Sequence, residues 1–354
     1  MARLSRRELL RTSAALGGFA LLQSCAPAAA PSPSPTTGAA SIAPASAAPK
    51  ATSAKAAWVA LTSNQMIWPV ALEAGYFKKY GLDLDLSYIN GSNNAMAAML
   101  GGQIGLTSVA GSAVVTAAAG GAEIVMIAGF VNKMIFRIMA SPPITKIEEL
   151  KGKTIAVTRL GTADYFAWQT IAAKQGWKTN DLVFIAANDP PGQVATLVAG
   201  KAAAIAVSPP NNILALKAGA KEILDMASYN EPEQNVGVAV TKKFLAEQRP
   251  AVLALMQGSI EAIARWKKDP AFVKDVIKKY LKNDEPDFLD VGYNAYKDVF
   301  QQAPYPSEDA LKKVIDEVSA QEPRSRDLKP ANLIDRTVIQ ELEASGFIKQ
   351  VFAQ

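Results

Sequence analysis

The sequence predicts an α/β fold made of two similar lobes with a ligand cleft between them. Strand-like and helix-like segments alternate, and Gly, Ser, Pro or Asn separate them. Sliding the chain against itself by 99 residues places Gly101 on Gly200 and Gly120 on Gly219. A constant offset over about 60 residues without gaps suggests two equivalent α/β units. If the match arises by chance, because Ala and Gly are common, two α/β units still remain.

Residues 1–24 have the pattern of a bacterial export signal. Four arginines lie before or at the start of an apolar stretch from about Thr12 to Leu22, which is shorter than the roughly 20 apolar residues of a membrane-spanning helix. The sequence SRRELL resembles a twin-arginine signal, and LQSC, ending at Cys25, resembles the lipobox of lipoproteins. We expect export and lipid attachment at Cys25. The alternative is an ordinary secretory signal with a chance cysteine, since Gln23 departs from the usual lipobox.

Residues 25–54 are predicted to be a tether. Of residues 26–54, 26 of 29 are Ala, Pro, Ser or Thr, and such a segment cannot bury enough apolar surface to offset chain entropy. The net charge of the whole chain is +5. Without residues 1–24 it falls to +2, which gives no footprint for nucleic acid. A lone cysteine excludes an internal disulfide.

The cleft is expected beside the carboxyl ends of the strands, where open α/β sheets bind their ligands. The loops predicted there are 62–66, 91–94, 110–112 and 130–132 in the first lobe, and 159–164, 188–193 and 208–212 in the second. Ser92, Ser112 and Thr162 stand at predicted helix N-termini, which favour anionic or strongly polar ligand groups. Most N-cap residues, however, only satisfy their own helix.

Five stretches in order carry a resemblance to a known family. They are AGYFKKYGLDLDL (74–86), NGSNNAMAAMLGGQIGLTSVAGSAV (90–114), LKGKTIAVTRLGTADYFA (150–167), VATLVAGKAAAIAVSPP (194–210) and SGFI (345–348). From Trp58 to Phe347 the chain resembles the solute-binding proteins of ABC importers for nitrate, alkanesulfonates and taurine, of the SsuA/TauA-like type. The resemblance implies a type II periplasmic-binding-protein fold that closes on one solute and delivers it to a membrane permease and its ATPase.

The family pattern also implies an organisation of the chain. It places two crossings between the lobes, near Ala140–Pro143 and Gly237–Thr241. The expected parts are the signal 1–24, the lipid-anchored tether 25–54, lobe one 55–140, lobe two 141–237, and a return to lobe one with C-terminal helices over 238–354. We expect a monomer in the periplasm or on the outer face of the cytoplasmic membrane, anchored through Cys25.

Candidate ligand residues follow where the family motifs survive. The stretch NGSNN gives Ser92 and Asn93, and TRLGTAD gives Arg159, Thr162 and Asp164. The whole predicted set is Ser63, Asn64, Ser92, Asn93, Ser112, Asn132, Arg159, Thr162, Asp164 and Gln193. The fork of Arg159 matches two oxygens of a carboxylate or sulfonate, although a structural ion pair is an equal alternative. Asp164 either favours the first turn of its helix or meets an N–H group of the ligand.

Two further points remain open in the sequence. Trp68, Phe130, Tyr165 and Phe166 are candidates for the pocket wall, and each is more readily explained as core. The solute is expected to be a small organic anion, or else a neutral pyrimidine-like compound.

Catalysis is not expected. Relatives of the same fold make the thiamine pyrimidine, which implies a histidine donor, and this chain contains no histidine. It also lacks the common nucleophile, zinc and phosphate-loop motifs. We therefore expect no catalytic residue, no metal and no cofactor. The alternatives are a pyrimidine-synthase-like enzyme and the binding lobe of a sensory system.

Overall fold

The computed structural model describes residues 52–353, and every structural statement below concerns that part of the chain. Residues 1–51 lie outside the described residues, and with them the predicted export signal, Cys25 and most of the predicted tether. The first strand begins at Thr52, inside the segment that the sequence assigns to the tether. It does so because Thr52 to Trp58 pair in register with Leu82 to Tyr88.

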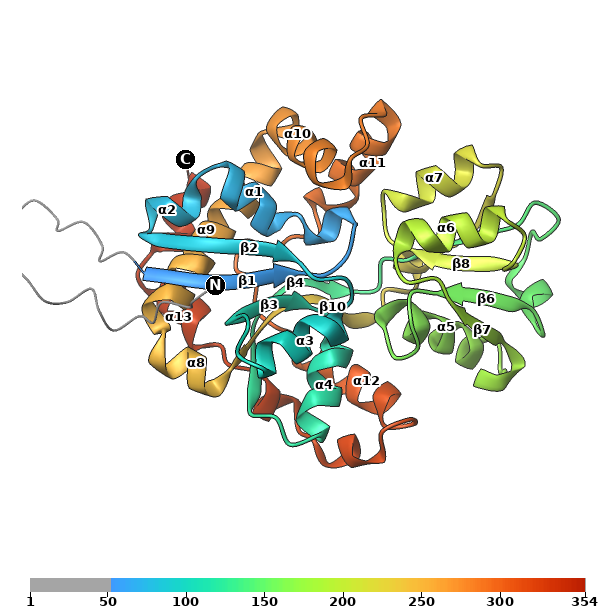
Figure 1. Cartoon of the computed structure of the whole chain (residues 1–354), viewed down its shortest axis with the longest axis horizontal. Coiled ribbons are helices and arrows are strands. Elements are labelled where there is room, and N and C mark those ends of the chain that lie inside the picture. Colours follow the sequence, from blue (N-terminus) through green and yellow to red (C-terminus); the bar gives the residue numbers. More distant parts are fainter. Residues whose placement is uncertain (1–51, 354) are drawn as a thin grey trace, which may run out of the picture. The chain divides into compact units, whose positions relative to one another are not determined.

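The first sheet has five strands in the order β2-β1-β3-β10-β4 (Figure 1). These strands are β1 (Thr52–Trp58), β2 (Leu82–Tyr88), β3 (Leu106–Val109), β4 (Ile124–Lys133) and β10 (Pro232–Thr241). Strand β1 is parallel to β2 and β3, whereas β10 is antiparallel to β3 and β4. The carboxyl ends of β1, β2 and β3 therefore meet at one edge of the sheet.

The second sheet repeats this arrangement in the order β7-β6-β8-β5-β9. Its strands are β5 (Arg137–Ala140), β6 (Thr154–Val157), β7 (Val183–Ala186), β8 (Ala204–Val207) and β9 (Lys221–Asp225). Strand β6 is parallel to β7 and β8, and β5 is the antiparallel member. Moving β1, β2, β3 and β4 along the chain by about 99 residues places them on β6, β7, β8 and β9. The two lobes have equivalent sheets.

The crossings between the sheets occupy residues 134–136 and 226–231. The sequence analysis expects them later in the chain, near Ala140–Pro143 and Gly237–Thr241. The difference arises because β5 pairs in the second sheet and β10 pairs in the first. A short apolar strand has the same sequence pattern whichever sheet it joins. The first crossing therefore comes before β5, and the second comes before β10, whereas the sequence analysis placed each crossing at or after the end of that strand.

The helices flank both sheets. Those between the strands are α1 (Ile67–Glu73), α2 (Tyr76–Lys79), α3 (Ser92–Leu100), α4 (Gly111–Ala119), α5 (Ala163–Lys174), α6 (Pro190–Val198) and α7 (Asn211–Lys217). Those after β10 are α8 (Lys242–Glu247), α9 (Arg249–Lys268), α10 (Pro270–Leu281), α11 (Pro286–Lys297), α12 (Glu308–Val318), α13 (Thr337–Ala344) and α14 (Phe347–Ala353). Short 3₁₀ turns are η1 (Ser63–Gln65), η2 (Ile147–Leu150), η3 (Thr179–Asp181), η4 (Met226–Tyr229), η5 (Pro323–Asp327) and η6 (Pro330–Leu333).

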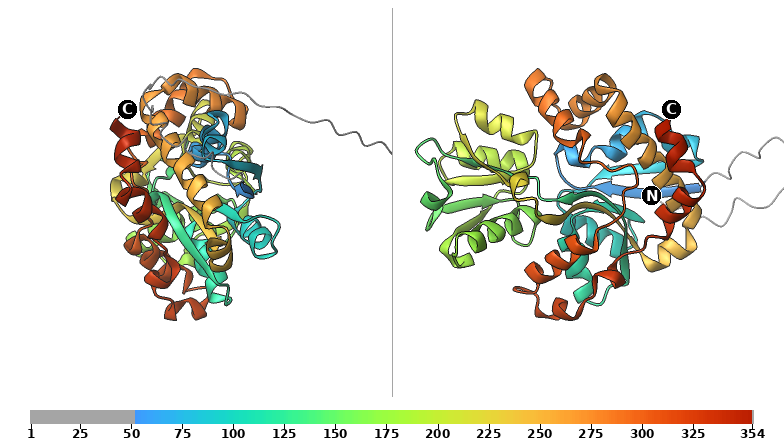
Figure 2. Two further views of the ribbon diagram at one scale, coloured as in Figure 1. Left: turned by 90° about the vertical axis from the view of Figure 1, so that its left-hand side faces the viewer. Right: turned by 180° about the vertical axis from the view of Figure 1, so that it is seen from behind.

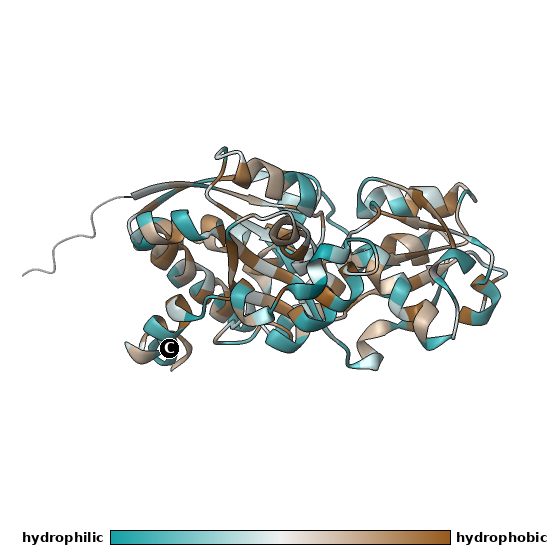
Figure 3. Cartoon of the chain, turned by 90° about the horizontal axis from the view of Figure 1, so that it is seen from below, coloured by the Kyte–Doolittle hydropathy of each residue, from teal (hydrophilic) through white to brown (hydrophobic). Residues whose placement is uncertain are grey.

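The C-terminal helices lie mainly around the first sheet, as Figure 2 shows from two sides. Helix α9 packs on α1, α2 and β1, and α12 packs on α4 and β10. Helix α11 also contacts α7 of the second lobe. Hydrophobic residues concentrate along the strands and the helix faces turned to them (Figure 3). The residues of the cleft thus lie on loops held by two packed cores.

Candidate functional site

A cavity of about 90 Å³ lies where the carboxyl ends of the strands of the two sheets face each other. By the space that one buried water occupies, it has room for on the order of six waters or a solute of that size. Its polar lining from the first lobe is Thr62, Asn64, Gln65, Asn90, Ser92 and Asn235. Its polar lining from the second lobe is Thr158, Arg159, Thr162, Asp164, Asn188, Asp189, Gln193 and Ser208.

Arg159 closes one side of the cavity. It follows β6 in the second lobe, and its Nη1 donates a hydrogen bond to the backbone oxygen of Asn90 in the first lobe, at 3.1 Å. The next residue, Gly91, has φ +88°, and a Cβ there would overlap the guanidinium. The arginine therefore bridges the lobes through backbone rather than through an acidic side chain.

Asp164 stabilises the loop that carries Arg159 by accepting several hydrogen bonds from it. Its carboxylate is buried and accepts hydrogen bonds from the backbone N–H of Thr158 at 2.6 Å and from the hydroxyls of Thr158 and Thr162 at 2.8 and 2.5 Å. Burial raises the pKa of the Asp164 carboxyl, and hydrogen bonds from Thr162 and Thr158 oppose that rise. These contacts fix the turn at the start of α5.

Gln193 ties this turn to the second sheet. Its Nε2 lies 3.1 Å from the Asp164 carboxylate, 3.0 Å from the backbone oxygen of Ala156 and 3.3 Å from that of Ala206. It therefore links β6 and β8 to the loop of Arg159. Gln193 lies on α6. Pro190 is the first residue of this helix, and Asp189 caps it by accepting a hydrogen bond from the backbone N–H of Gly192 at 2.7 Å.

Tyr88, the last residue of β2, is close enough to two charged residues of the cavity lining for them to shift its pKa. Its ring lies 4.6 Å from that of Trp58, centroid to centroid. Burial raises the pKa of Tyr88 to about 12, the carboxylate of Asp189 adds to this rise, and Arg159 opposes it. The pKa of Tyr88 in the first lobe thus depends on the charges of Asp189 and Arg159 in the second lobe.

In the first lobe the polar residues are linked to one another. Ser92 accepts the backbone N–H of Ala110 at 3.2 Å, which joins the start of α3 to the end of β3. Asn64 accepts the hydroxyl of Thr62 and donates its Nδ2 to the Oδ1 of Asn235 at 3.0 Å. This chain of contacts crosses from η1 to β10.

Six of the predicted ligand residues line the cavity: Asn64, Ser92, Arg159, Thr162, Asp164 and Gln193. The other four do not. Ser63 is buried against Gly292, Asn93 is exposed, and Ser112 is buried in the first turn of α4. Asn132 lies on β4, where it donates to the backbone oxygen of Tyr305 at 2.8 Å.

Several lining residues were absent from the predicted set. Gln65 and Asp189 lie in loops that the sequence marked, but their types gave no reason to prefer them to their neighbours. Phe136 comes from the first crossing, which the sequence placed elsewhere, and Asn235 comes from β10, the strand that follows the second crossing. The aromatic candidates Trp68, Phe130, Tyr165 and Phe166 are all buried in the core, and none of them is part of the wall.

The two lobes also touch on both sides of the cavity. On one side Asn211 donates its Nδ2 to the backbone oxygen of Leu61 at 3.0 Å, and α7 meets α11 through Lys217 and Glu285. On the other side Thr170 of α5 donates to Glu317 of α12 at 3.1 Å. The cavity is therefore held between contacts that opening of the lobes would break.

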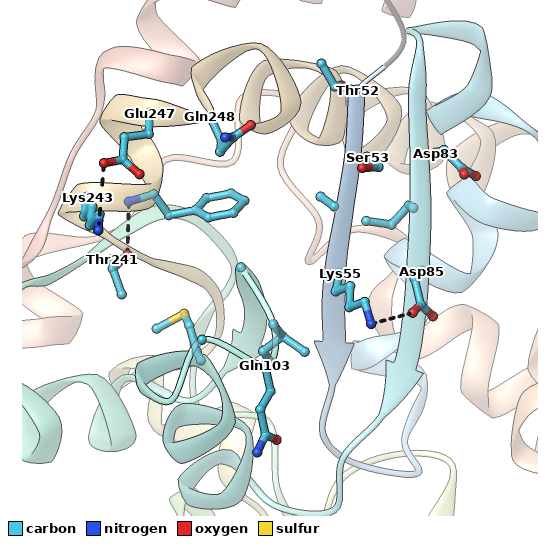
Figure 4. Close-up of a pocket in the computed structure, with 17 residues that line it drawn as sticks. Thr52, Ser53, Lys55, Asp83, Asp85, Gln103, Thr241, Lys243, Glu247 and Gln248 are labelled. Carbon is cyan, nitrogen blue, oxygen red and sulfur yellow. Dashed lines mark hydrogen bonds and ion pairs between the residues drawn. The ribbon is translucent and has the colours of Figure 1, made fainter. Parts of the chain in front are cut away.

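A larger hollow of about 700 Å³ lies at the opposite edge of the first sheet (Figure 4). Its charged side chains pair with each other, as Lys55 with Asp85 at 3.8 Å and Lys243 with Glu247 at 4.0 Å, and these groups are more than half exposed. It is an open groove of solvated charges without a set of converging polar groups. The cavity between the lobes is the better candidate site.

Neither a metal site nor a membrane-spanning helix is found in residues 52–353. No cluster of three or more acidic, cysteine or histidine side chains is placed to hold a metal ion there. Among the helices of this part of the chain, none has the length and apolar character needed to cross a bilayer.

Comparison with known proteins identifies the family of the chain and solved structures with the same fold. Residues 62–272 match the model of the NMT1/THI5 like family. No match was found among curated proteins. Solved structures that resemble this one include the alkanesulfonate-binding protein SsuA of Xanthomonas axonopodis pv. citri, with 15% identity over 81% of this chain and 99% of that one, and a TM-score of 0.69.

Two other solved structures are similar. The nitrate-binding protein NrtA of Synechocystis PCC 6803 has 15% identity over 84% of this chain and 90% of its own, with a TM-score of 0.66. The ligand-binding component of an ABC-type import system of Staphylococcus aureus has 13% identity over 82% of this chain and 98% of its own, with a TM-score of 0.67. All three are binding proteins rather than enzymes, and they share the periplasmic-binding-protein fold with this chain.

Proposed function

Because the chain belongs to the NMT1/THI5-like family and has the periplasmic-binding-protein fold, we propose that it is the solute-binding component of an ABC importer. It captures a small molecule outside the cytoplasm and delivers it to a permease and its ATPase. The observation that carries this proposal is the small polar cavity between the lobes, to which both lobes contribute side chains. We propose binding and release of one solute, with no catalytic step.

Opening and closing of the lobes is the proposed mechanism. A solute that contacts both walls of the cavity stabilises the closed form by its differential affinity for the two forms. The hydrogen bond from Arg159 to Asn90 supports this mechanism, because it forms only when the two loops are close. Release to the permease then requires these contacts to break.

A small organic anion, such as a sulfonate or carboxylate, is the proposed solute. Arg159 supports this choice, because it is the one cationic side chain among the described residues that line the cavity. One of its nitrogens is used by Asn90, and the rest of the planar fork remains available to an oxyanion. The carboxyls of Asp164 and Asp189 favour a solute that also carries hydrogen-bond donors, and a neutral heterocycle is the second choice.

Export and anchoring are proposed from the sequence alone. The arginine pair and the LQSC motif support export as a lipoprotein with a lipid attached to Cys25. We expect Cys25→Ala to move the protein from the membrane fraction to the soluble fraction of the cell envelope, while solute affinity stays unchanged. Cell fractionation with an immunoblot tests this, and membrane retention of the variant would contradict the anchor.

The solute is tested by a thermal-shift screen of the protein against nitrate, bicarbonate, alkanesulfonates, taurine, aromatic carboxylates and pyrimidines. A ligand at a thousandfold its Kd adds about 4 kcal/mol to the free energy of unfolding, which raises Tm by several degrees. A response from one chemical class supports the proposal and names the solute.

Arg159→Ala provides the matching variant. We expect it to weaken affinity for the responding anion by tenfold or more, about 1.4 kcal/mol, with a small change in Tm. A large loss of Tm with unchanged affinity would make Arg159 a structural residue and contradict the anion site.

A further inference from the structure

The residues that the two lobes contribute to the cavity differ in their chemistry. The second lobe contributes the charged groups, which are the guanidinium of Arg159 and the carboxyls of Asp164 and Asp189. The first lobe contributes uncharged amides, among them Gln65 and Asn235. A solute that contacts both lobes therefore meets all the charged side chains of the lining on the second lobe and only uncharged polar groups on the first.

Among the residues that the first lobe contributes, Gln65 has a buried side-chain oxygen without a protein partner in residues 52–353. It ends the 3₁₀ turn that follows β1, it lines the cavity, and only 5% of its surface is exposed. Its Oε1 is buried and has no hydrogen-bond partner within residues 52–353. Since a buried acceptor left without a donor costs about 1–3 kcal/mol, native proteins rarely keep one that has no use.

The side chains of Thr62, Asn64 and Asn235, which line the cavity together with Gln65, are bonded to one another rather than to Gln65. The hydroxyl of Thr62 donates to the Oδ1 of Asn64, and the Nδ2 of Asn64 donates to the Oδ1 of Asn235. This order also fixes the side chain of Asn235: its oxygen is occupied, and its Nδ2 group makes no hydrogen bond within the described part of the chain. The wall from the first lobe thus presents one acceptor, on Gln65, and one donor, on Asn235, that are not bonded to each other.

We propose that Gln65 is a specificity residue that recognises a primary carboxamide or ureide group on the solute. The NH₂ group of the solute donates to the Oε1 of Gln65, and its carbonyl accepts from the Nδ2 of Asn235. A primary amide supplies one such donor and one such acceptor in a planar group. The anionic group of the same solute pairs with Arg159 of the second lobe. This inference rests on the proposed function and names the solute class of the same site.

The test compares probes that differ only in the NH₂ group. The pairs are succinamate and levulinate, N-carbamoylglycine and N-acetylglycine, and carbamoylmethanesulfonate and acetylmethanesulfonate. In each pair a methyl group replaces NH₂, so charge and shape are retained and the donor is lost. Affinities are measured by calorimetry on the full-length protein and on Gln65→Met, which keeps the length of the side chain. Gln340→Met, at an exposed position on α13, is the matched control.

We expect the protein to bind at least one of the carbamoyl probes about tenfold more tightly than its methyl partner. Gln65→Met should reduce this ratio to near one by weakening the carbamoyl probe, leaving the methyl probe within about twofold. Gln340→Met should keep the full ratio.

The other outcomes separate the two proposals. Equal binding of both members of every pair, or a full ratio in Gln65→Met, overturns the role of Gln65 and leaves the importer function standing. If the protein binds no member of these pairs and no compound of the wider screen, the proposed function fails and this inference fails with it.

Discussion

The cleft requires glycine at position 91, because a side chain there would collide with Arg159. The Arg159 guanidinium occupies the space where a Cβ would lie, and φ is +88°. Two separate effects therefore oppose a larger residue: backbone strain, which any position with positive φ shares, and loss of the bridge between the lobes.

Gly91→Ala separates these effects when it is compared with Gly102→Ala. Gly102 has φ +73°, and no atom lies within 4 Å of the point that a Cβ would occupy there, so that variant carries the strain alone. We expect both variants to lose about 1 kcal/mol of unfolding free energy. Only Gly91→Ala should also lose solute affinity, by about tenfold, as measured by calorimetry with the best ligand of the screen. Equal affinities in the two variants would show that the bridge contributes nothing to binding.

The residues of the site show what sequence can and cannot predict. Arg159, Thr162 and Asp164 were predictable because they fall in one short motif, and local spacing alone brings them together. Asn235 was not, because it reaches the cavity from β10, a strand whose sheet partner is far away in the sequence. Asn132 was expected at a strand end, yet β4 runs to Lys133 and turns that side chain to Tyr305.

At the level of elements, β10, α12 and α5 meet around a network of acids and lysines. Glu233 of β10 is buried, and Glu317 and Lys313 of α12 face it. Lys313 is 3.6 Å from Glu231 in the second crossing and 3.7 Å from Glu317. Lys174 of α5 pairs with Glu231 at 2.7 Å, and Thr170 donates to Glu317. The network therefore joins the two lobes behind the cavity.

This network predicts how stability depends on pH. Burial raises the pKa of Glu233 well above its ordinary value of 4.5, the charge of Glu317 adds to the rise, and Lys313 opposes it. An acid whose pKa is raised by folding contributes stability that is complete below the unfolded pKa and is lost as pH rises through the folded pKa. We expect Glu233→Gln to flatten the fall of unfolding free energy above pH 4.5, by about 1.4 kcal/mol for each unit of raised pKa.

Urea unfolding at a series of pH values measures this effect, and Glu231→Gln is the control of opposite sign. The hydrogen bond from Lys174 lowers the pKa of Glu231 against the smaller effect of burial, so its contribution is present above 4.5 and lost as pH falls. Its substitution should reduce the loss of stability at acid pH instead. Parallel profiles for the protein and Glu233→Gln would contradict a buried acid that titrates in the folded state.

At the scale of the whole molecule, the shift of 99 residues predicted the architecture better than any single strand did. Strands β1 to β4 and β6 to β9 fall on one another because each lobe is built from the same α/β unit. The crossings could not be placed in this way, since β5 and β10 are the strands where the chain changes lobe. Only the pairing of each strand with its neighbours reveals the lobe that holds it.

Contacts between the lobes predict a measurable effect far from the solute. Asn211, on α7, is buried and donates to the backbone oxygen of Leu61 in the first lobe. We expect Asn211→Ala to weaken the closed form by about 1 kcal/mol, because it leaves that oxygen without its donor. Solute affinity should fall about fivefold, mostly through faster dissociation in stopped-flow experiments. Asn294→Ala, at an exposed position on α11, should dissociate at the normal rate, and equal rates for both would contradict the role of the contact.

The position of the second sheet has a consequence for synthesis of the chain. All five of its strands come from one continuous stretch, 137–225, whereas the first sheet needs β10 at 232–241 to lie between β3 and β4. On the ribosome the inner stretch therefore emerges complete while the outer sheet still has an open slot in its middle. The first sheet, whose strands are the first to be synthesised, is therefore the last to be completed. Its strand β10 can pair with β3 and β4 only after the whole second lobe has left the exit tunnel.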